Sequence, residues 1–131
     1  QVGVLVEVDC ESDFVARTED FQGLVKEIAM HIAAANPTCV RREDVPSTDI
    51  ETEKVIYRKQ FEDSNKPAQV IDKIVEGKIN SYYEQVVLLD QPSIRDPKTT
   101  IGAMINAAIA KLGENISVTR FSRFKVGEQD T

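Results

Sequence analysis

Residues 3–35 read GVLVEVDCESDFVARTEDFQGLVKEIAMHIAAA and contain two hydrophobic periods, one after the other. Over residues 3–10 the apolar residues alternate, which predicts a half-buried strand whose apolar face is formed by Val4, Val6, Val8 and Cys10. Over residues 19–35 the apolar residues recur every three or four positions, which predicts a helix that ends at Asn36-Pro37. Met30 lies opposite this stripe, either exposed or in contact with something outside the domain.

The next segments predict a strand and two long helices. Residues 38–41 predict a short second strand. After Pro46, a capping box of Thr48 and Glu51 predicts a helix that runs to about residue 62. Another helix starts at residues 65–67 and continues to about Leu89, too long for a small core to cover, so we expect it to project as one arm of a helical hairpin.

The last third of the chain predicts a loop, a helix and a strand. Residues 90–98 hold two prolines and predict a loop, and residues 101–112 predict a helix that begins after Thr100 and ends at Gly113. Residues 116–126 predict a strand whose apolar side changes along its length, as a β-bulge or burial on both faces would produce.

This order of elements predicts an α+β fold. We expect a small, three-stranded, mostly antiparallel sheet that helices cover on one face, with a projecting helical hairpin. The other face of the sheet is then left for a partner.

The composition is that of one ordinary soluble domain, and we expect the protein to be intracellular. The chain has 131 residues, of which 41% are hydrophobic and 29% charged, a net charge of −6 and a pI near 4.8. This acidic balance disfavours nucleic acid or an anionic membrane as the main partner. Neither a membrane span nor a signal peptide is expected. The chain enters strand-like sequence at once and without a methionine, which predicts a segment of a longer polypeptide.

Two cysteines and one histidine are too few for a disulfide scaffold or a zinc site. Cys10 shares the apolar side of the first strand, so we expect a buried free thiol, and we expect the same of Cys39. A disulfide between them, or between two chains, is the alternative. His31 lies beside the helix stripe and is expected either to be partly exposed or to support another polar side chain. A nucleophile made of Cys10 and His31 has no residue to orient the imidazole, so an enzyme is not expected.

The densest group of polar side chains lies between the first strand and the first long helix. The spacing of Asp9, Glu11 and Asp13 is that of a calcium loop. Such a loop needs glycine at its sixth position, where this chain has Phe14, and a glutamate at its twelfth, where it has Asp20. The sequence therefore disfavours a calcium site.

Two interpretations of the next residues stay open. In the first, Ser12-Asp13 caps a helix and Phe14 folds into the core. In the second, an aspartate and a phenylalanine on a rigid turn act as a wedge, in which the ring enters an apolar cleft of a partner and the carboxylate competes for its polar groups.

Residues 120–125 read RFSRFK and interleave cations with aromatic rings. This pattern is found in proteins that bind single-stranded nucleic acid. An ordinary sheet strand, with aromatic residues facing inward and charges outward, accounts for the same residues and is favoured.

Residues 6–21 read VEVDCESDFVARTEDF and resemble V-E-V-N-C-E-T-D-F-V-A-R-N-E-x-F, the signature of elongation factor Ts, the guanine-nucleotide exchange factor for elongation factor Tu. The departures are Asp9 and Thr18, each in place of Asn, and Ser12, which keeps the hydroxyl of Thr. Segments similar to the family continue along the whole chain: KP at 66–67, IVEGKI at 74–79, LLDQP at 88–92, KLGENI at 111–116 and RFSRFKVGE at 120–128.

The resemblance implies the core domain of such a factor, with the family's small N-terminal helical module upstream and absent here. The single core and the segment LLDQP look most like short cyanobacterial or plastid members, which implies the bacterial cytoplasm or the plastid stroma. Members with one core can pair sheet to sheet as homodimers. The uncovered sheet face expected above is compatible with such a homodimer.

The resemblance also implies which residues contact elongation factor Tu, in its GDP-bound and nucleotide-free forms: Asp13 and Phe14, with their neighbours Ser12 and Val15. The Phe14 ring would enter between helices of the nucleotide domain and, with Asp13, disturb the magnesium ion and the phosphate-binding loop. It implies no cofactor, no chemical reaction, and no direct contact with nucleic acid or membrane. The alternative function is a protein-interaction or ribosome-associated module with little exchange activity.

Overall fold

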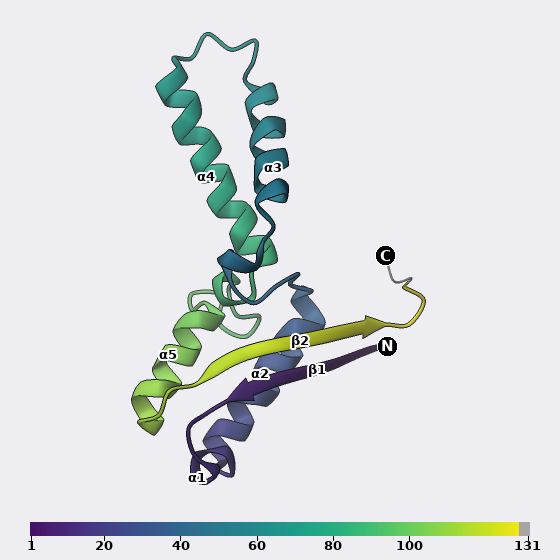
Figure 1. Cartoon of the computed structure of the whole chain (residues 1–131), viewed down its shortest axis with the longest axis vertical. Coiled ribbons are helices and arrows are strands. Elements are labelled where there is room, and N and C mark those ends of the chain that lie inside the picture. The colour runs from purple at the N-terminus through teal and green to yellow at the C-terminus, as the bar shows by residue number, and fades with distance from the viewer. Residues whose placement is uncertain (129–131) are drawn as a thin grey trace.

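A computed structural model describes residues 1–128 and has the α+β fold expected from the sequence (Figure 1). The predicted helices over residues 19–35 and 101–112 are confirmed, and so are the first and last strands. With η for a 3-10 helix, the elements are β1 (Val2–Asp9), α1 (Asp13–Ala16), α2 (Glu19–Ala35), η1 (Arg42–Asp44), α3 (Ser47–Gln60), α4 (Ala68–Val86), η2 (Leu88–Asp90), α5 (Ile101–Leu112) and β2 (Ser117–Lys125).

Strands β1 and β2 come from opposite ends of the chain and pair antiparallel. The pairing shifts by one residue between Glu7 and Val8 of β1, which makes Thr119 of β2 the extra residue of a β-bulge. The bulge moves the following side chains to the other side of the strand, so that Val118 and Phe121 both contribute to the core. Of the two explanations expected from the sequence, the β-bulge is the one present, and it accounts for the change of apolar side along this strand.

Over residues 1–128 the sheet has two strands. The prediction of a third strand at residues 38–41 is therefore wrong. Cys39 instead forms an isolated parallel bridge with Val87, just after α4. The guanidinium of Arg41 reaches β2 and donates to the carbonyl of Val118 at 3.4 Å. The segment contacts β2 through this side chain, while its backbone bonds go to the connection between α4 and η2.

Helix α2 lies across the inner face of the sheet, and α5 packs beside it (Figure 1). Ile28 and Ile32 of α2 and Ile101 of α5 are fully buried in the core that these elements share with β2. Met30 is 54% exposed on the opposite side of α2, as its position outside the apolar stripe predicts. The helix ends at Asn36, whose left-handed backbone (φ 49°) closes it before the proline.

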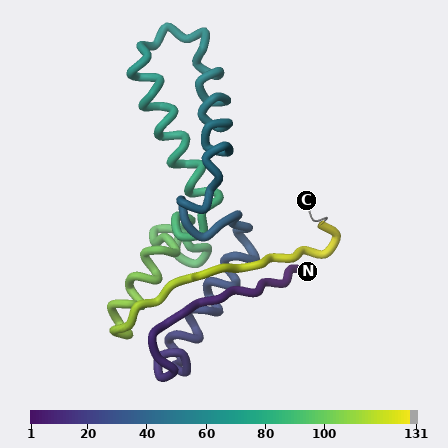
Figure 2. Tube along the Cα trace, viewed as in Figure 1, coloured from purple at the N-terminus to yellow at the C-terminus, as the bar shows by residue number. Residues whose placement is uncertain are grey.

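The predicted hairpin is confirmed: α3 and α4 pack against each other and extend away from the sheet (Figure 2). No side chain of α3 is buried, while Val75 and Ile79 of α4 are. Arg58 and Asp72 form an ion pair at 2.7 Å between the two helices. The hairpin is held mainly by contacts within itself.

The ends of the hairpin helices differ from the prediction. Helix α3 begins at Ser47 with Pro46 as its N-cap, so Thr48 lies inside the first turn and the expected capping box with Glu51 does not form. Helix α4 ends at Val86, where the backbone becomes extended and leads into η2. Within residues 1–128, no helix is both long and apolar enough to cross a membrane.

Candidate functional site

The single-turn helix α1, which follows β1, carries an aromatic side chain into solvent. Phe14 is 87% exposed, the largest value among the exposed large apolar residues. Its neighbour Val15 is 9% exposed and belongs to the core. Because adjacent residues of a helix point about 100° apart, a buried Val15 turns Phe14 away from the core. The interpretation in which Phe14 folds inward is therefore wrong.

Helix caps hold α1 in place at both ends. The hydroxyl of Ser12 accepts a hydrogen bond from Val15 N at 3.4 Å, which confirms the predicted N-cap. The hydroxyl of Thr18 accepts from Phe21 N at 3.2 Å, at the start of α2, and donates to Val15 O at 2.7 Å. This second cap was not predicted from the sequence, although a threonine three residues before an apolar stripe is a usual N-cap signal.

The loop between β1 and α1 is tied to the turn between α5 and β2. Gly113 ends α5 in the left-handed region (φ 73°), and the chain then brings Glu114 to this loop. One carboxylate oxygen of Glu114 accepts from Glu11 N at 3.1 Å and Ser12 N at 2.9 Å, and the other accepts from Ser12 Oγ at 2.5 Å. Glu11 Oε2 accepts in return from Asn115 N at 2.8 Å. No local pattern in the sequence indicated these contacts.

Of the four residues expected to contact a partner, two face solvent. Asp13 is exposed in the first turn of α1, beside Phe14. Ser12 is half-buried and caps this helix, and Val15 lies in the core. The geometry presents a carboxylate and a ring together on a short, anchored turn.

Asp9 and Glu11, two of the acidic residues whose spacing resembles a calcium loop, form hydrogen bonds to other parts of the chain. The carboxylate of Asp9 accepts a hydrogen bond from the hydroxyl of Thr119 at 2.5 Å, and this bond is the main reason that the pKa of Asp9 is lowered. Glu11 accepts from the backbone of Asn115. In the part of the chain that the structure describes, no three His, Cys, Asp or Glu side chains come together as a metal ion would require.

His31 is 1% exposed, so the prediction of a partly exposed histidine is wrong. Its Nε2 donates to Gln91 Oε1 at 2.8 Å, and Gln91 Nε2 donates to Gln85 O at 2.7 Å. Gln91, in the turn after η2, satisfies Nε2 of this buried ring, while Nδ1 has no hydrogen-bond partner among the described residues. His31 joins α2 to the base of the hairpin.

Both cysteines are free and partly buried. The Sγ of Cys10 donates to Ser12 O at 3.3 Å, whereas His31 bonds to Gln91, so the two side chains do not act as nucleophile and base. Burial raises the pKa of Cys39.

The aromatic residues of β2 do not both face inward as predicted. Phe121 packs against the core, but Phe124 is 63% exposed. The side chain of Arg123 is 12% exposed, and its guanidinium donates to Ala33 O from Nε at 3.2 Å and from Nη2 at 3.1 Å. The two rings face opposite sides of the sheet because side chains alternate strictly along the strand after the bulge, and Phe121 and Phe124 are three positions apart.

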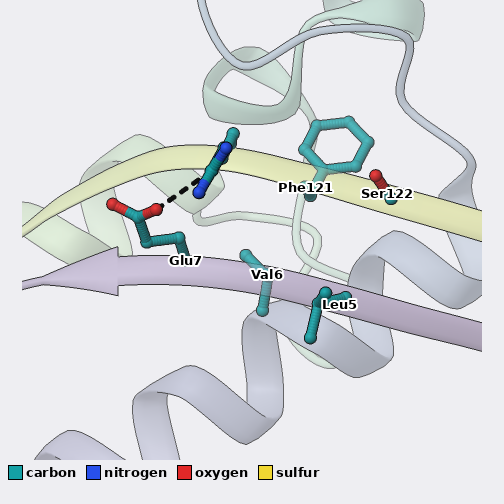
Figure 3. Close-up of a pocket in the computed structure, with 6 residues that line it drawn as sticks. Leu5, Val6, Glu7, Phe121 and Ser122 are labelled. Carbon is teal, nitrogen blue, oxygen red and sulfur yellow. Dashed lines mark hydrogen bonds and ion pairs between the residues drawn. The ribbon is translucent and has the colours of Figure 1, made fainter.

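The outer face of the sheet is therefore apolar in part. Leu5 is 76% exposed, and Phe124 lies on the same side of the ladder as Leu5. A shallow hollow of about 450 Å³ crosses the two strands beside Leu5, next to the ion pair of Glu7 and Arg120 at 3.0 Å (Figure 3). Exposed apolar groups of this kind are typical of protein contact surfaces.

Residues 1–128 match the family model of elongation factor Ts. The chain is 59% identical over 128 residues to elongation factor Ts of Koribacter versatilis, an alignment that covers 98% of this chain and 58% of that protein. It is 54% identical to elongation factor Ts of Citrifermentans bemidjiense, again over 98% of the chain and 59% of the relative. The chain thus spans about three fifths of the length of these curated relatives. A match of this length and identity shows that the chain belongs to the elongation factor Ts family.

Proposed function

We propose that this chain binds elongation factor Tu, in its GDP-bound and nucleotide-free forms, and promotes the release of GDP. The observation that carries the proposal is the exposed ring of Phe14 on an anchored turn, 87% accessible and beside the carboxylate of Asp13. Aromatic side chains that a partner buries remove a large apolar area from water and contribute strongly to binding at interfaces. Membership of the family supports the choice of partner.

The mechanism is a competition between two ligands of one GTPase. The Phe14 ring enters between helices of the nucleotide domain, and the Asp13 carboxylate competes for polar groups near the magnesium ion and the phosphate-binding loop. The chain binds the nucleotide-free form more tightly than the GDP form, and by reciprocity it weakens GDP binding by the same factor. No covalent step is involved, and the magnesium ion belongs to the GTPase.

The relatives are longer than this chain, so the proposal concerns the exchange core that residues 1–131 make up. Such a core works where translation takes place, in the bacterial cytoplasm or the plastid stroma. It acts on a protein and contacts neither nucleic acid nor membrane directly, in keeping with its net charge of −6.

The test is the rate at which elongation factor Tu releases a fluorescent GDP analogue in a stopped-flow instrument. We expect the rate to rise with the concentration of this chain and to reach a plateau about tenfold or more above the rate without it. A ribosome-associated module would leave the rate unchanged at every concentration, and that result would refute the exchange function.

We also propose that two copies of the chain pack the outer faces of their sheets together. The supporting observation is the pair of exposed apolar side chains on that face, Leu5 and Phe124. Burying such side chains between two copies removes apolar surface from water without changing the fold of either.

Light scattering over a range of concentrations tests this pairing. We expect the mass of two 14.6 kDa chains, and we expect Leu5→Lys to give the mass of one because a charge would be buried at the contact. Val55→Lys, on an exposed residue of α3, is the matched control and keeps the dimer. A wild-type chain that stays monomeric, or a Leu5→Lys variant that stays dimeric, contradicts the proposal.

A further inference from the structure

The carboxylate of Glu114 holds the loop that carries the proposed wedge. It accepts three hydrogen bonds, from Glu11 N, Ser12 N and Ser12 Oγ, across a sequence separation of 102 to 103 residues. The return bond from Asn115 N to Glu11 Oε2 makes the contact reciprocal. Two turns far apart in the sequence are thereby fixed to each other.

Helix α1 needs such an external support. It has four residues, and a single helical turn is not stable in water by itself because its nucleation is unfavourable. Ser12 connects the support to the helix, since its hydroxyl accepts from Val15 N and donates to Glu114. The direction of the exposed Phe14 ring therefore depends on residues 11 and 12, whose positions Glu114 sets.

We infer that Glu114 is a positioning residue for the Asp13-Phe14 turn, an inference that rests on the exchange function proposed above. Glu114 holds the turn, before any partner arrives, in the conformation that binds. A turn ordered in advance loses less conformational entropy on binding. Removal of the carboxylate therefore raises the concentration of chain needed for exchange and leaves the maximal rate unchanged, because the ring and the carboxylate that act on the GTPase are still present.

The experiment compares Glu114→Ala with Glu114→Gln in the stopped-flow assay. We expect Glu114→Ala to raise the half-saturating concentration about tenfold, because it removes all three acceptor contacts. Glu114→Gln keeps an oxygen that can accept from both backbone N–H groups, and its value should stay within about twofold of wild type. Asp44→Ala is the matched control, because Asp44 also accepts from a backbone N–H, that of Arg41 at 3.1 Å, but in η1 rather than in this loop. A fall in the maximal rate with no change in half-saturation overturns the inference.

A double-mutant cycle separates positioning from a general loss of stability. If Glu114 acts through the ring, Glu114→Ala should change half-saturation by less than about twofold when Phe14→Ala is already present. Additive effects of the two substitutions would show that Glu114 acts by another route, and the inference would fail.

A third readout does not depend on exchange. The chain contains no tryptophan, so Phe14→Trp places a single tryptophan on the turn, which can be excited selectively above the absorption of the three tyrosines. We expect the decay of its fluorescence anisotropy to show faster local motion with Glu114→Ala and no change with Asp44→Ala. Unchanged motion would overturn the positioning role even if exchange is observed. If Glu114→Ala gives faster motion but the wild-type chain does not accelerate GDP release, the exchange function is refuted. The contact between Glu114 and the turn is then still supported.

Discussion

Phe14→Ala should raise the concentration of this chain needed for half-maximal GDP release from elongation factor Tu by about 30-fold, which corresponds to a hot-spot residue at an interface. The maximal rate should also fall, because the ring is the group that intrudes into the GTPase. The fold should not suffer, since Phe14 is 87% exposed and its neighbour Val15 supplies the core contact of α1. Stopped-flow release of fluorescent GDP measures both quantities.

Met30→Ala is the matched control for this substitution. It also truncates an exposed apolar side chain, 54% accessible, but on the far side of α2. We expect wild-type exchange from it. Urea unfolding should give both variants the same free energy of unfolding as wild type within about 0.5 kcal/mol. Normal exchange by a folded Phe14→Ala chain would refute the wedge.

Ile32→Ala should lower the free energy of unfolding by about 2–5 kcal/mol. Ile32 is fully buried where α2 crosses the sheet, and alanine there leaves a cavity that the surrounding side chains cannot close. A domain of this kind is stable by only about 5–15 kcal/mol, so the loss is a large part of the total. The midpoint of urea unfolding measures it, with an unchanged slope as the sign that the unfolded state is not affected.

The same helix provides the reference for this prediction. Met30→Ala also puts the best helix-forming residue into α2, so the difference between the two variants reports burial rather than helix propensity. If both substitutions changed the midpoint equally, the assignment of Ile32 to the core and of Met30 to the surface would be wrong.

Elements with a strong period and clear end signals could be predicted from the sequence. In α5, both predicted ends are present, since Thr100 Oγ1 accepts from Ala103 N at 3.1 Å and Gly113 adopts φ 73°. Residues 38–41 could not be predicted in the same way. Their backbone groups had two competing partners, β2 and the connection after α4, and the choice depends on where α4 ends in three dimensions.

In the candidate site too, local features could be predicted from the sequence, whereas contacts between distant residues could not. The cap of Ser12 is a local feature and was predicted. The residues alone left the direction of Phe14 open, because a ring on a turn can point inward or outward until the packing of Val15 is known, and only the family resemblance implied an exposed ring. His31 is buried because Gln91, 60 residues later, supplies an acceptor. The contacts of Glu114 could not be predicted from the sequence, since its partners lie more than 100 residues away along the chain.

The pairing of β1 with β2 has a consequence for how this protein is made. Glu7 and Arg120, which meet across the ladder, are 113 residues apart, so the sheet closes a loop that contains most of the chain. Contacts between residues so far apart in the sequence form slowly, because closing the loop costs conformational entropy before the contacts stabilise the fold. During synthesis, β1 leaves the ribosome long before its partner exists. A factor proposed to serve elongation can therefore complete its own core only after residues 117–125 have been synthesised and have left the ribosome.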